Sequence, residues 1–229
     1  MSLSYAICVP WRDNRDGVRA RLWDYCEWRL KLSGIPYYVA DDGREHGEPF
    51  NVSAARNRAV RQSTEDIVLI MDADHIVQRQ AVDAVLGKLE TLDLPWAPIF
   101  SSNGVFTFFQ TEAILANELD PIEAIPELTE RYCTSPLAIR RDVFEDVGGY
   151  NESYSGWGAE DAEFRSVLFT LHPIPAEANP VDNMNRCLFH QWAQEPVTWN
   201  SHLAVIHGYD AIHAQGPEAV RAYIEARKG

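Results

Sequence analysis

The chain has 229 residues, of which 46% are hydrophobic and 24% are charged, and its formal net charge is −14. This composition predicts a globular protein with a sizeable core and excludes a disordered chain. The negative balance argues against non-specific binding of nucleic acid, because the phosphate backbone would be repelled.

The N-terminal sequence, the apolar stretches and the cysteines indicate the cellular compartment of the protein. The four cysteines stand far apart, with neither a Cys-x-x-Cys pair nor the dense spacing of a disulfide scaffold. No signal peptide is visible, because the first apolar run is short and soon meets Arg12 and Asp13. No apolar stretch approaches the length of a membrane span. We therefore expect a cytoplasmic protein without a membrane span.

Apolar runs alternate with helical periodicity over the first third of the chain. The patterns predict strands at residues 4–10, 35–40 and 67–71, and helices at residues 16–32, 52–62 and 78–89. In the first helix we expect an inward face made of Val18, Leu22, Tyr25, Trp28 and Leu32. This β-α-β-α-β order predicts half of a nucleotide-binding sheet.

The remaining two thirds show weaker patterns. They predict strands at residues 96–101, 105–110, 132–139 and 174–178, helices at 140–147, 160–171 and 217–228, and a partly helical stretch at 112–130. A short apolar run at residues 186–190 ends in His190. Because no linker divides the chain, we predict a single α/β domain in which helices flank a mostly parallel central sheet.

Two aspartates, Asp72 and Asp74, follow the apolar run at residues 67–71. Such a run is typical of a strand buried on both faces, and ligands gather where the strands of open α/β sheets end. Two carboxylates there repel unless a cation lies between them or one is protonated. Mg²⁺ and Mn²⁺ prefer such oxygen ligands. The alternative is an aspartate pair that caps the next helix. Strand alternation predicts that His75 points away from the pair.

Further motifs occur in order around this pair: Asp41-Asp42 after the second strand, Arg56-Asn57 in the next helix, Gly-Trp-Gly-Ala-Glu-Asp at residues 156–161, and His190. The order resembles the GT-A nucleotide-diphospho-sugar glycosyltransferases. It is most similar to their metal-dependent inverting branch, which includes β-1,4-galactosyltransferases and bacterial chondroitin polymerases. The resemblance spans roughly residues 4 to 192, and residues 137–164 carry its most specific part.

This resemblance implies a GT-A fold, with a nucleotide-sugar-binding half at about residues 1–100 and an acceptor-binding and catalytic half at about 101–229. It implies six substrate-binding residues in the first half: Pro10, Arg12, Asp41, Asp42, Arg56 and Asn57. One aspartate of the 41–42 pair would contact uracil and ribose, and Arg56 would lie near the base or the diphosphate. The alternatives are a turn aspartate before Gly43 and an arginine on a solvated helix face.

The resemblance also implies a metal site for Mn²⁺ or Mg²⁺. Asp74 would bind the metal directly, Asp72 would be a second ligand or a substrate contact, and His190 would be the third ligand. Cys187 stands where galactosyltransferases carry a sulfur ligand, but a thiolate is a poor match for Mg²⁺.

The Gly-Trp-Gly motif and the acids after it would carry the chemistry. Trp157, followed by Gly158, can close over the donor sugar, and Glu160 would hold sugar hydroxyls. Asp161 would be the general base on the face opposite the leaving UDP. Retaining relatives more often carry Glu-Asn here, so Asp161 implies inversion. The alternative is a helix N-terminus that favours acids.

We therefore expect a metal-dependent inverting transferase that moves a hexose or N-acetylhexosamine from a UDP-sugar to an acceptor hydroxyl. The acceptor can be a glycan, a protein, a lipid or a modified nucleobase. The alternatives are a retaining transferase, a non-catalytic nucleotide-sugar-binding module, and a phosphatase of the haloacid dehalogenase type. The phosphatase family places its aspartate pair on the first strand and carries Thr or Val where Ile76 stands.

Overall fold

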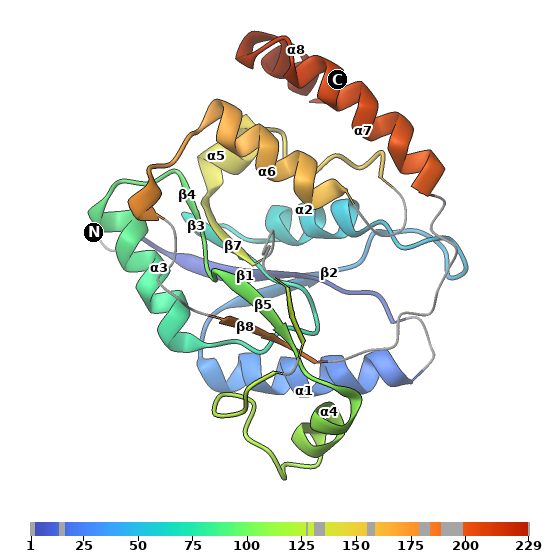
Figure 1. Ribbon diagram of the computed structural model, residues 1–229, viewed down its shortest axis with the longest axis vertical. Coiled ribbons are helices and arrows are strands. Elements are labelled where there is room, and N and C mark those ends of the chain that lie inside the picture. Colours follow the sequence, from blue (N-terminus) through green and yellow to red (C-terminus); the bar gives the residue numbers. More distant parts are fainter. Residues whose placement is uncertain are drawn as a thin grey trace.

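The computed structural model of the chain describes residues 3–13, 17–126, 128–130, 136–154, 159–178, 184–188 and 199–228. A five-stranded sheet with the order β2-β1-β3-β7-β4 forms its centre (Figure 1). The strands are β1 (Tyr5–Pro10), β2 (Tyr37–Ala40), β3 (Ile67–Ile70), β4 (Trp96–Pro98) and β7 (Leu137–Arg140). β1 pairs in parallel with β2 and β3, whereas β7 runs antiparallel to β3 and β4. The predicted α/β class with a mostly parallel sheet is confirmed.

Helices cover both faces of this sheet (Figure 1). One face carries α1 (Val18–Ser33) and α3 (Arg79–Thr91). The other face carries α2 (Val52–Gln62), α5 (Arg141–Asp146), α6 (Glu160–Leu171), α7 (Trp199–His213) and α8 (Pro217–Lys228). The two helical layers bury two separate apolar clusters against the sheet.

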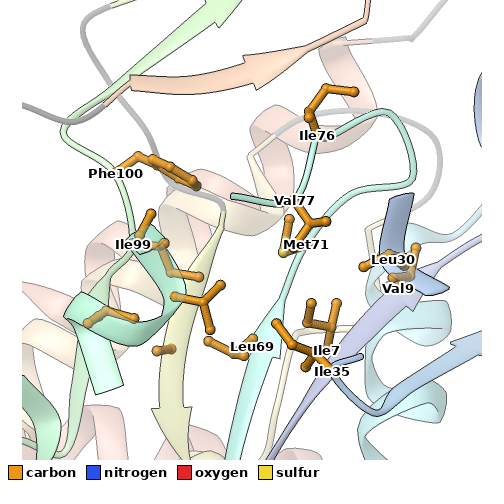
Figure 2. Close-up of a cluster of buried hydrophobic side chains, with 14 of the residues drawn as sticks. Ile7, Val9, Leu30, Ile35, Leu69, Met71, Ile76, Val77, Ile99 and Phe100 are labelled. Atoms are coloured by element: carbon orange, nitrogen blue, oxygen red, sulfur yellow. The ribbon is translucent and has the colours of Figure 1, made fainter. Parts of the chain in front are cut away.

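Strand alternation sorts the apolar side chains between these two clusters. Ile7, Val9 and Leu69 belong to the cluster under α1 and α3 (Figure 2), whereas Cys8 and Val68 belong to the opposite one. All four residues of β3 are buried. The continuous apolar runs of the sequence therefore mark strands that are covered on both sides, as predicted.

A second sheet has the order β6-β5-β8 and joins the second half of the chain to the first. Its strands are β5 (Ser102–Val105), β6 (Leu128–Glu130) and β8 (Met184–Cys187). β8 runs parallel to β5, and Cys187 forms a β-bridge with His75, which lies just after β3. This bridge brings the late part of the chain to the end of the central sheet.

The predicted strand at residues 105–110 is wrong, because β5 already ends at Val105 and helix α4 (Phe108–Leu115) follows. Thr107 and Gln110 form a capping box in which each side chain bonds the backbone of the other. Such reciprocal bonds satisfy N–H groups at a helix start. They outweigh the β-propensity of the phenylalanines in this segment.

The predicted strand at residues 174–178 is also wrong, and one helix was not predicted. Ala176–Ala178 form a 3₁₀ turn in which the Ala178 amide donates to the Pro175 carbonyl over 3.0 Å. Proline supplies no amide hydrogen for a strand ladder. The unpredicted helix is α7, whereas α8 has the predicted bounds.

The inward face of helix α1 is only partly the predicted one: Leu22 is buried and Tyr25 is partly buried against the core, as predicted, but the other three predicted residues are exposed. Its buried residues are Leu22, Trp23, Cys26 and Leu30. Val18, Trp28 and Leu32 are exposed. Both sets recur at helical spacing, so periodicity alone left the choice between them undecided.

Candidate active site

The loops that carry the predicted donor-site residues meet at one edge of the central sheet. β1, β2 and β3 are parallel, so their carboxyl ends share this edge. Pro10 ends β1 opposite Ala40, the last residue of β2. Asp41 and Asp42 follow β2 directly, and Asp72 stands two residues after β3.

A buried arginine, Arg56, joins three carboxylates at this edge. Its side chain is only 2% exposed and lies on α2. Nη2 donates to Asp72 Oδ1 over 2.7 Å, and Nη1 donates to Asp161 Oδ1 over 2.6 Å. Nη1 also lies 3.4 Å from Glu160 Oε1. One guanidinium thus connects the aspartate after β3 with the acidic pair that begins α6.

The carboxylates around Arg56 keep its guanidinium protonated. Burial acts to lower the pKa of Arg56, but the carboxylates of Asp161 and Asp72 raise this pKa well above its usual value. The guanidinium carbon lies 4.9 Å from the ring centre of Tyr150. That ring stacks on Phe164 of α6 with 3.9 Å between centroids. The cation therefore has an aromatic wall on one side and carboxylates on the other.

The two acids of α6 differ in accessibility. The Asp161 side chain is 22% exposed, whereas that of Glu160 is 5% exposed. α6 begins after Ala159, which has a φ of 71° and makes no side-chain cap bond. A general base must reach the hydroxyl that it deprotonates, so Asp161 is the better placed of the two.

Asp42 organises the loop between β2 and α2. It is 8% exposed, and its Oδ2 accepts the Asn51 amide over 2.8 Å. Arg12 donates to Asp42 Oδ1 over 3.0 Å and to the Glu48 carbonyl over 2.6 Å. The Arg12 guanidinium also lies 5.2 Å from the ring centre of Phe50. The predicted residues Arg12 and Asp42 therefore lie together at the carboxyl ends of β1 and β2.

Asp41 and Asn57 have local partners. Asp41 Oδ1 accepts the Gly43 amide over 3.0 Å, the turn bond that was the alternative to a ligand contact. Asn57 Nδ2 donates to the Tyr150 carbonyl over 2.9 Å, and its Oδ1 accepts the Tyr150 amide over 2.9 Å. Nδ2 also donates to Glu152 over 2.8 Å. The carboxamide of Asn57 thus fixes the segment that carries Tyr150.

Asp74 and His75 lie in a turn after β3. The His75 amide donates to the Asp72 carbonyl over 3.2 Å, and the Asp74 carbonyl accepts the Leu188 amide over 2.9 Å. Because the chain turns here, strand alternation does not apply. His75 Nε2 lies 3.7 Å from Asp74 Oδ1. The expectation that His75 points away is therefore wrong. Asp74 is 23% exposed.

Three predicted site residues, Trp157, Gly158 and His190, lie outside the described residues. Within the described ranges, no group of three or more His, Cys, Asp or Glu side chains is placed to hold a metal. None of the helices in those ranges is both long and apolar enough to cross a bilayer.

Two residues of the site were not assigned from the sequence. Tyr150 supports Arg56, and Glu163 is 4% exposed in the first turn of α6. The available signal for Tyr150 was its place directly after Gly148-Gly149, where φ is 71° and 65°. Such a turn fixes the direction in which the next side chain leaves the backbone.

Comparison with known families supports the resemblance seen in the sequence. The family model described as Glycosyl transferase family 2 matches residues 44–148, which is less than half of the chain. The matched stretch contains Arg56, Asn57, Asp72 and Asp74. The resemblance to glycosyltransferases is confirmed by this match. A search of curated proteins finds no match.

Solved structures with a similar chain path include two of Drosophila β-1,4-galactosyltransferase 7. One is a mutant in complex with manganese, UDP-Gal and xylobiose, at 19% identity and a TM-score of 0.40. The other is the catalytic domain with xylobiose, at 20% identity and a TM-score of 0.40. Each alignment covers 71% of this chain and 59% of the other. The chain thus spans about three fifths of the length of these proteins.

Proposed function

We propose that this chain is a metal-dependent inverting glycosyltransferase. It moves a hexose or N-acetylhexosamine from a UDP-sugar to the hydroxyl of an acceptor. The match to Glycosyl transferase family 2 supports the reaction class. The inversion, the metal and the donor are inferred from the residues at the edge of the central sheet.

One observation carries the proposal. Asp72 and Asp161 are 89 residues apart in the sequence, yet both accept a hydrogen bond from Arg56, over 2.7 and 2.6 Å. Asp72 and the acids that begin α6 therefore share one site. This site lies where the strands end, at the position where ligands bind in open α/β sheets.

Asp161 is the general base of the proposed reaction. Its carboxylate takes the proton of the acceptor hydroxyl while the acceptor oxygen forms a bond to the anomeric carbon. The bond between that carbon and the UDP oxygen breaks, and UDP leaves with the electron pair. Arg56 orients the Asp161 carboxylate, because Nη1 of the charged guanidinium donates to its Oδ1 at short range.

The metal is assigned to Asp72, Asp74 and His190. Asp72 and Asp74 are partly exposed carboxylates, 32% and 23%, and offer the oxygen ligands that Mn²⁺ and Mg²⁺ prefer. Leu188 is bonded to the Asp74 carbonyl. His190 stands two positions after Leu188 in the sequence, a length of chain that spans at most about 7 Å. When bound, the metal neutralises the departing diphosphate.

The loop of Arg12 and Asp42 is assigned to the nucleotide, with Asp41 and Pro10 beside it. Arg12 stacks on Phe50 and pairs with Asp42, which gives this end of the site one aromatic face and several polar edges. We assign Asn57 a positioning role, because its amide binds the backbone of Tyr150. Glu160, which is buried beside Arg56, would contact sugar hydroxyls.

The experiment is a donor panel with purified protein. Drosophila β-1,4-galactosyltransferase 7 was solved with manganese and UDP-Gal, so UDP-Gal with Mn²⁺ is the first condition, followed by other UDP- and GDP-sugars. UDP release that requires a divalent ion, and that falls about 100-fold or more in Asp74→Ala and His190→Ala, is expected. Full activity in excess chelator would refute the metal assignment. Binding without turnover in every condition, or release of phosphate alone, would refute the transferase.

A further inference from the structure

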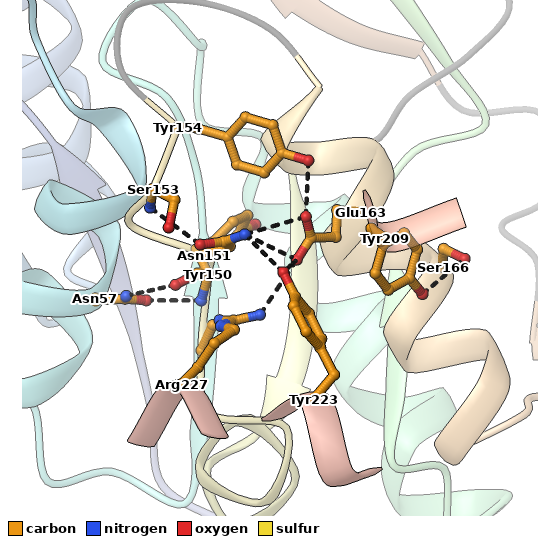
Figure 3. Close-up of polar contacts among 11 residues, drawn as sticks. Asn57, Tyr150, Asn151, Ser153, Tyr154, Glu163, Ser166, Tyr209, Tyr223 and Arg227 are labelled. Carbon is orange, nitrogen blue, oxygen red and sulfur yellow. Dashed lines mark hydrogen bonds and ion pairs between the residues drawn. The ribbon is translucent and has the colours of Figure 1, made fainter. Parts of the chain in front are cut away.

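A second buried carboxylate, Glu163, connects the candidate site to the C-terminal helix. Its side chain is 3% exposed and lies two residues after Asp161. The Tyr154 hydroxyl donates to Oε2 over 2.7 Å, the Tyr223 hydroxyl to Oε1 over 3.0 Å, and Arg227 Nη1 to Oε1 over 3.2 Å (Figure 3). A buried charge is tolerated only when it is paired and hydrogen-bonded in this way.

The donors to Glu163 come from two separate segments. Asn151 Nδ2 lies 3.2 Å from both carboxylate oxygens and 2.9 Å from the Tyr223 hydroxyl. Asn151 and Tyr154 belong to the segment 149–154, whereas Tyr223 and Arg227 belong to α8. Burial and the charge of Glu163 raise the pKa of Tyr223 to about 12, so its hydroxyl stays a donor. Glu163 thus fastens three parts of the chain together.

The side chains of Glu163 and Asp161 project from opposite sides of α6. Residues two positions apart on a helix point about 200° apart. Arg56 therefore contacts the side that carries Asp161, while α8 contacts the side that carries Glu163. The residue before the helix, Ala159, has a left-handed conformation and provides no side-chain cap. Such a start persists only where surrounding contacts fix it.

Arg227 also contacts the segment that carries Tyr150, the residue whose ring supports Arg56. Its Nη2 donates to the Gly149 carbonyl over 3.1 Å. Gly149 precedes Tyr150, whose ring lies under the Arg56 guanidinium, and a Cβ added at Gly149 would come within 2.6 Å of Asn57 Oδ1. From α8, contacts therefore run to Arg56 by two routes, through α6 and through Tyr150.

We propose that Arg227 and Tyr223 of α8 act through Glu163 as positioning residues for Asp161 and Arg56, so that the C-terminal helix is part of the catalytic apparatus. This inference rests on the proposed function for its kinetic test. It assigns no contact with substrate to α8. It predicts that weakening the polar contacts of α8 slows turnover without weakening donor binding.

The kinetic test compares variants of the full chain. Arg227→Met removes the charge partner of Glu163, Tyr223→Phe removes one hydroxyl, and Arg227→Lys keeps the charge. The control is Ile224→Val, which lies on the same helix but belongs to the apolar cluster and is 1% exposed. Well below the unfolding temperature, kcat should fall about 10- to 100-fold in Arg227→Met, less in Tyr223→Phe and Arg227→Lys, and stay near wild type in the control.

The Michaelis constant for the donor separates positioning from binding. It should stay within about threefold of wild type in all variants. If Arg227→Met and Ile224→Val lower kcat alike, in proportion to their lost stability, α8 acts only as a scaffold and the proposal is overturned. A rise in KM with unchanged kcat would overturn it as well.

A wild-type protein that transfers no sugar would refute the proposed function but not this inference. A hydrogen-exchange measurement tests the inference in that case. Amide hydrogen exchange is followed in peptides that cover residues 149–154 and 159–164. Arg227→Met should lose protection there by about tenfold or more, while Ile224→Val keeps it. Equal protection in both variants would show that α8 does not position these segments.

Discussion

Replacing Arg56 by methionine tests most sharply the clamp in which this arginine joins Asp72, Asp161 and Glu160. Methionine keeps much of the side-chain volume but removes the charge that Asp72, Asp161 and Glu160 share. The three carboxylates then lose the guanidinium that joins them. We expect a large loss of folding stability, because the arginine is 2% exposed and the charges cannot all reach water.

The magnitude follows from the exposure of each partner. Removing one member of a buried ion pair costs about 3–5 kcal/mol. Asp72 and Asp161 are 32% and 22% exposed, so water recovers part of their loss, whereas Glu160 is 5% exposed. Together with the lost contact to Tyr150, we expect Arg56→Met to lower the free energy of unfolding by about 3 kcal/mol. Arg56→Lys should lose less, because it keeps the charge but not the forked geometry.

Urea unfolding of the purified variants measures this difference. Arg58→Met is the matched control on the same helix, because Arg58 is 44% exposed and lies 3.5 Å from the exposed Asp41. It should change stability by less than about 0.5 kcal/mol. If Arg56→Met loses less than about 1 kcal/mol, or no more than Arg58→Met, the carboxylates do not depend on Arg56 and the reasoning fails.

Two further predictions concern parts of the fold outside this clamp. Burial acts to raise the pKa of Asp146, but Arg221 and His172 lower it below its usual range. Its stabilising effect is therefore present at neutral pH and is lost as the pH falls through about 4 and below. Urea unfolding should show Asp146→Asn less stable than wild type by about 0.5–1 kcal/mol at pH 7, with the difference shrinking as the pH falls below about 4. A difference independent of pH would contradict the ion pairing. Burial raises the pKa of the Cys8 thiol to about 12. Iodoacetamide at pH 8 should therefore label Cys8 only after denaturation, as measured by peptide mass spectrometry. Rapid labelling of Cys8 in the native protein would contradict its burial.

Local chemistry made much of the fold predictable from the sequence. The strands β1, β2 and β3 are short apolar runs bounded by Pro10, Gly34 or acidic residues, and Asn51 accepts the Ala54 amide as the cap of α2. Helix α7 was not predicted, although Thr198, a residue type that favours helix starts, directly precedes it in the sequence. The inward face of α1 was misjudged because Trp28 and Leu32 are as apolar as the residues that are buried.

The candidate site shows a different limit. Residue types and spacing identified Asp72 and Asp161, but not that a single arginine would join them. Arg56 was expected near the nucleotide or on a solvated face, and it is buried between carboxylates. That arrangement depends on the contacts of Arg56, on α2, with the acids of α6 and with the Tyr150 ring, which are tertiary contacts that no local pattern encodes.

The stereochemistry and rate of sugar transfer in the wild type and in Asp161→Asn test the central claim most directly. The amide can still accept the hydrogen bond from Arg56, so donor affinity should stay within about threefold of wild type while kcat falls about 100-fold or more. The wild-type product should carry the anomeric configuration opposite to that of the UDP-sugar. A product that retains the donor configuration, or an Asp161→Asn variant that turns over at the wild-type rate, would contradict the assignment of Asp161 as the base of an inverting transferase.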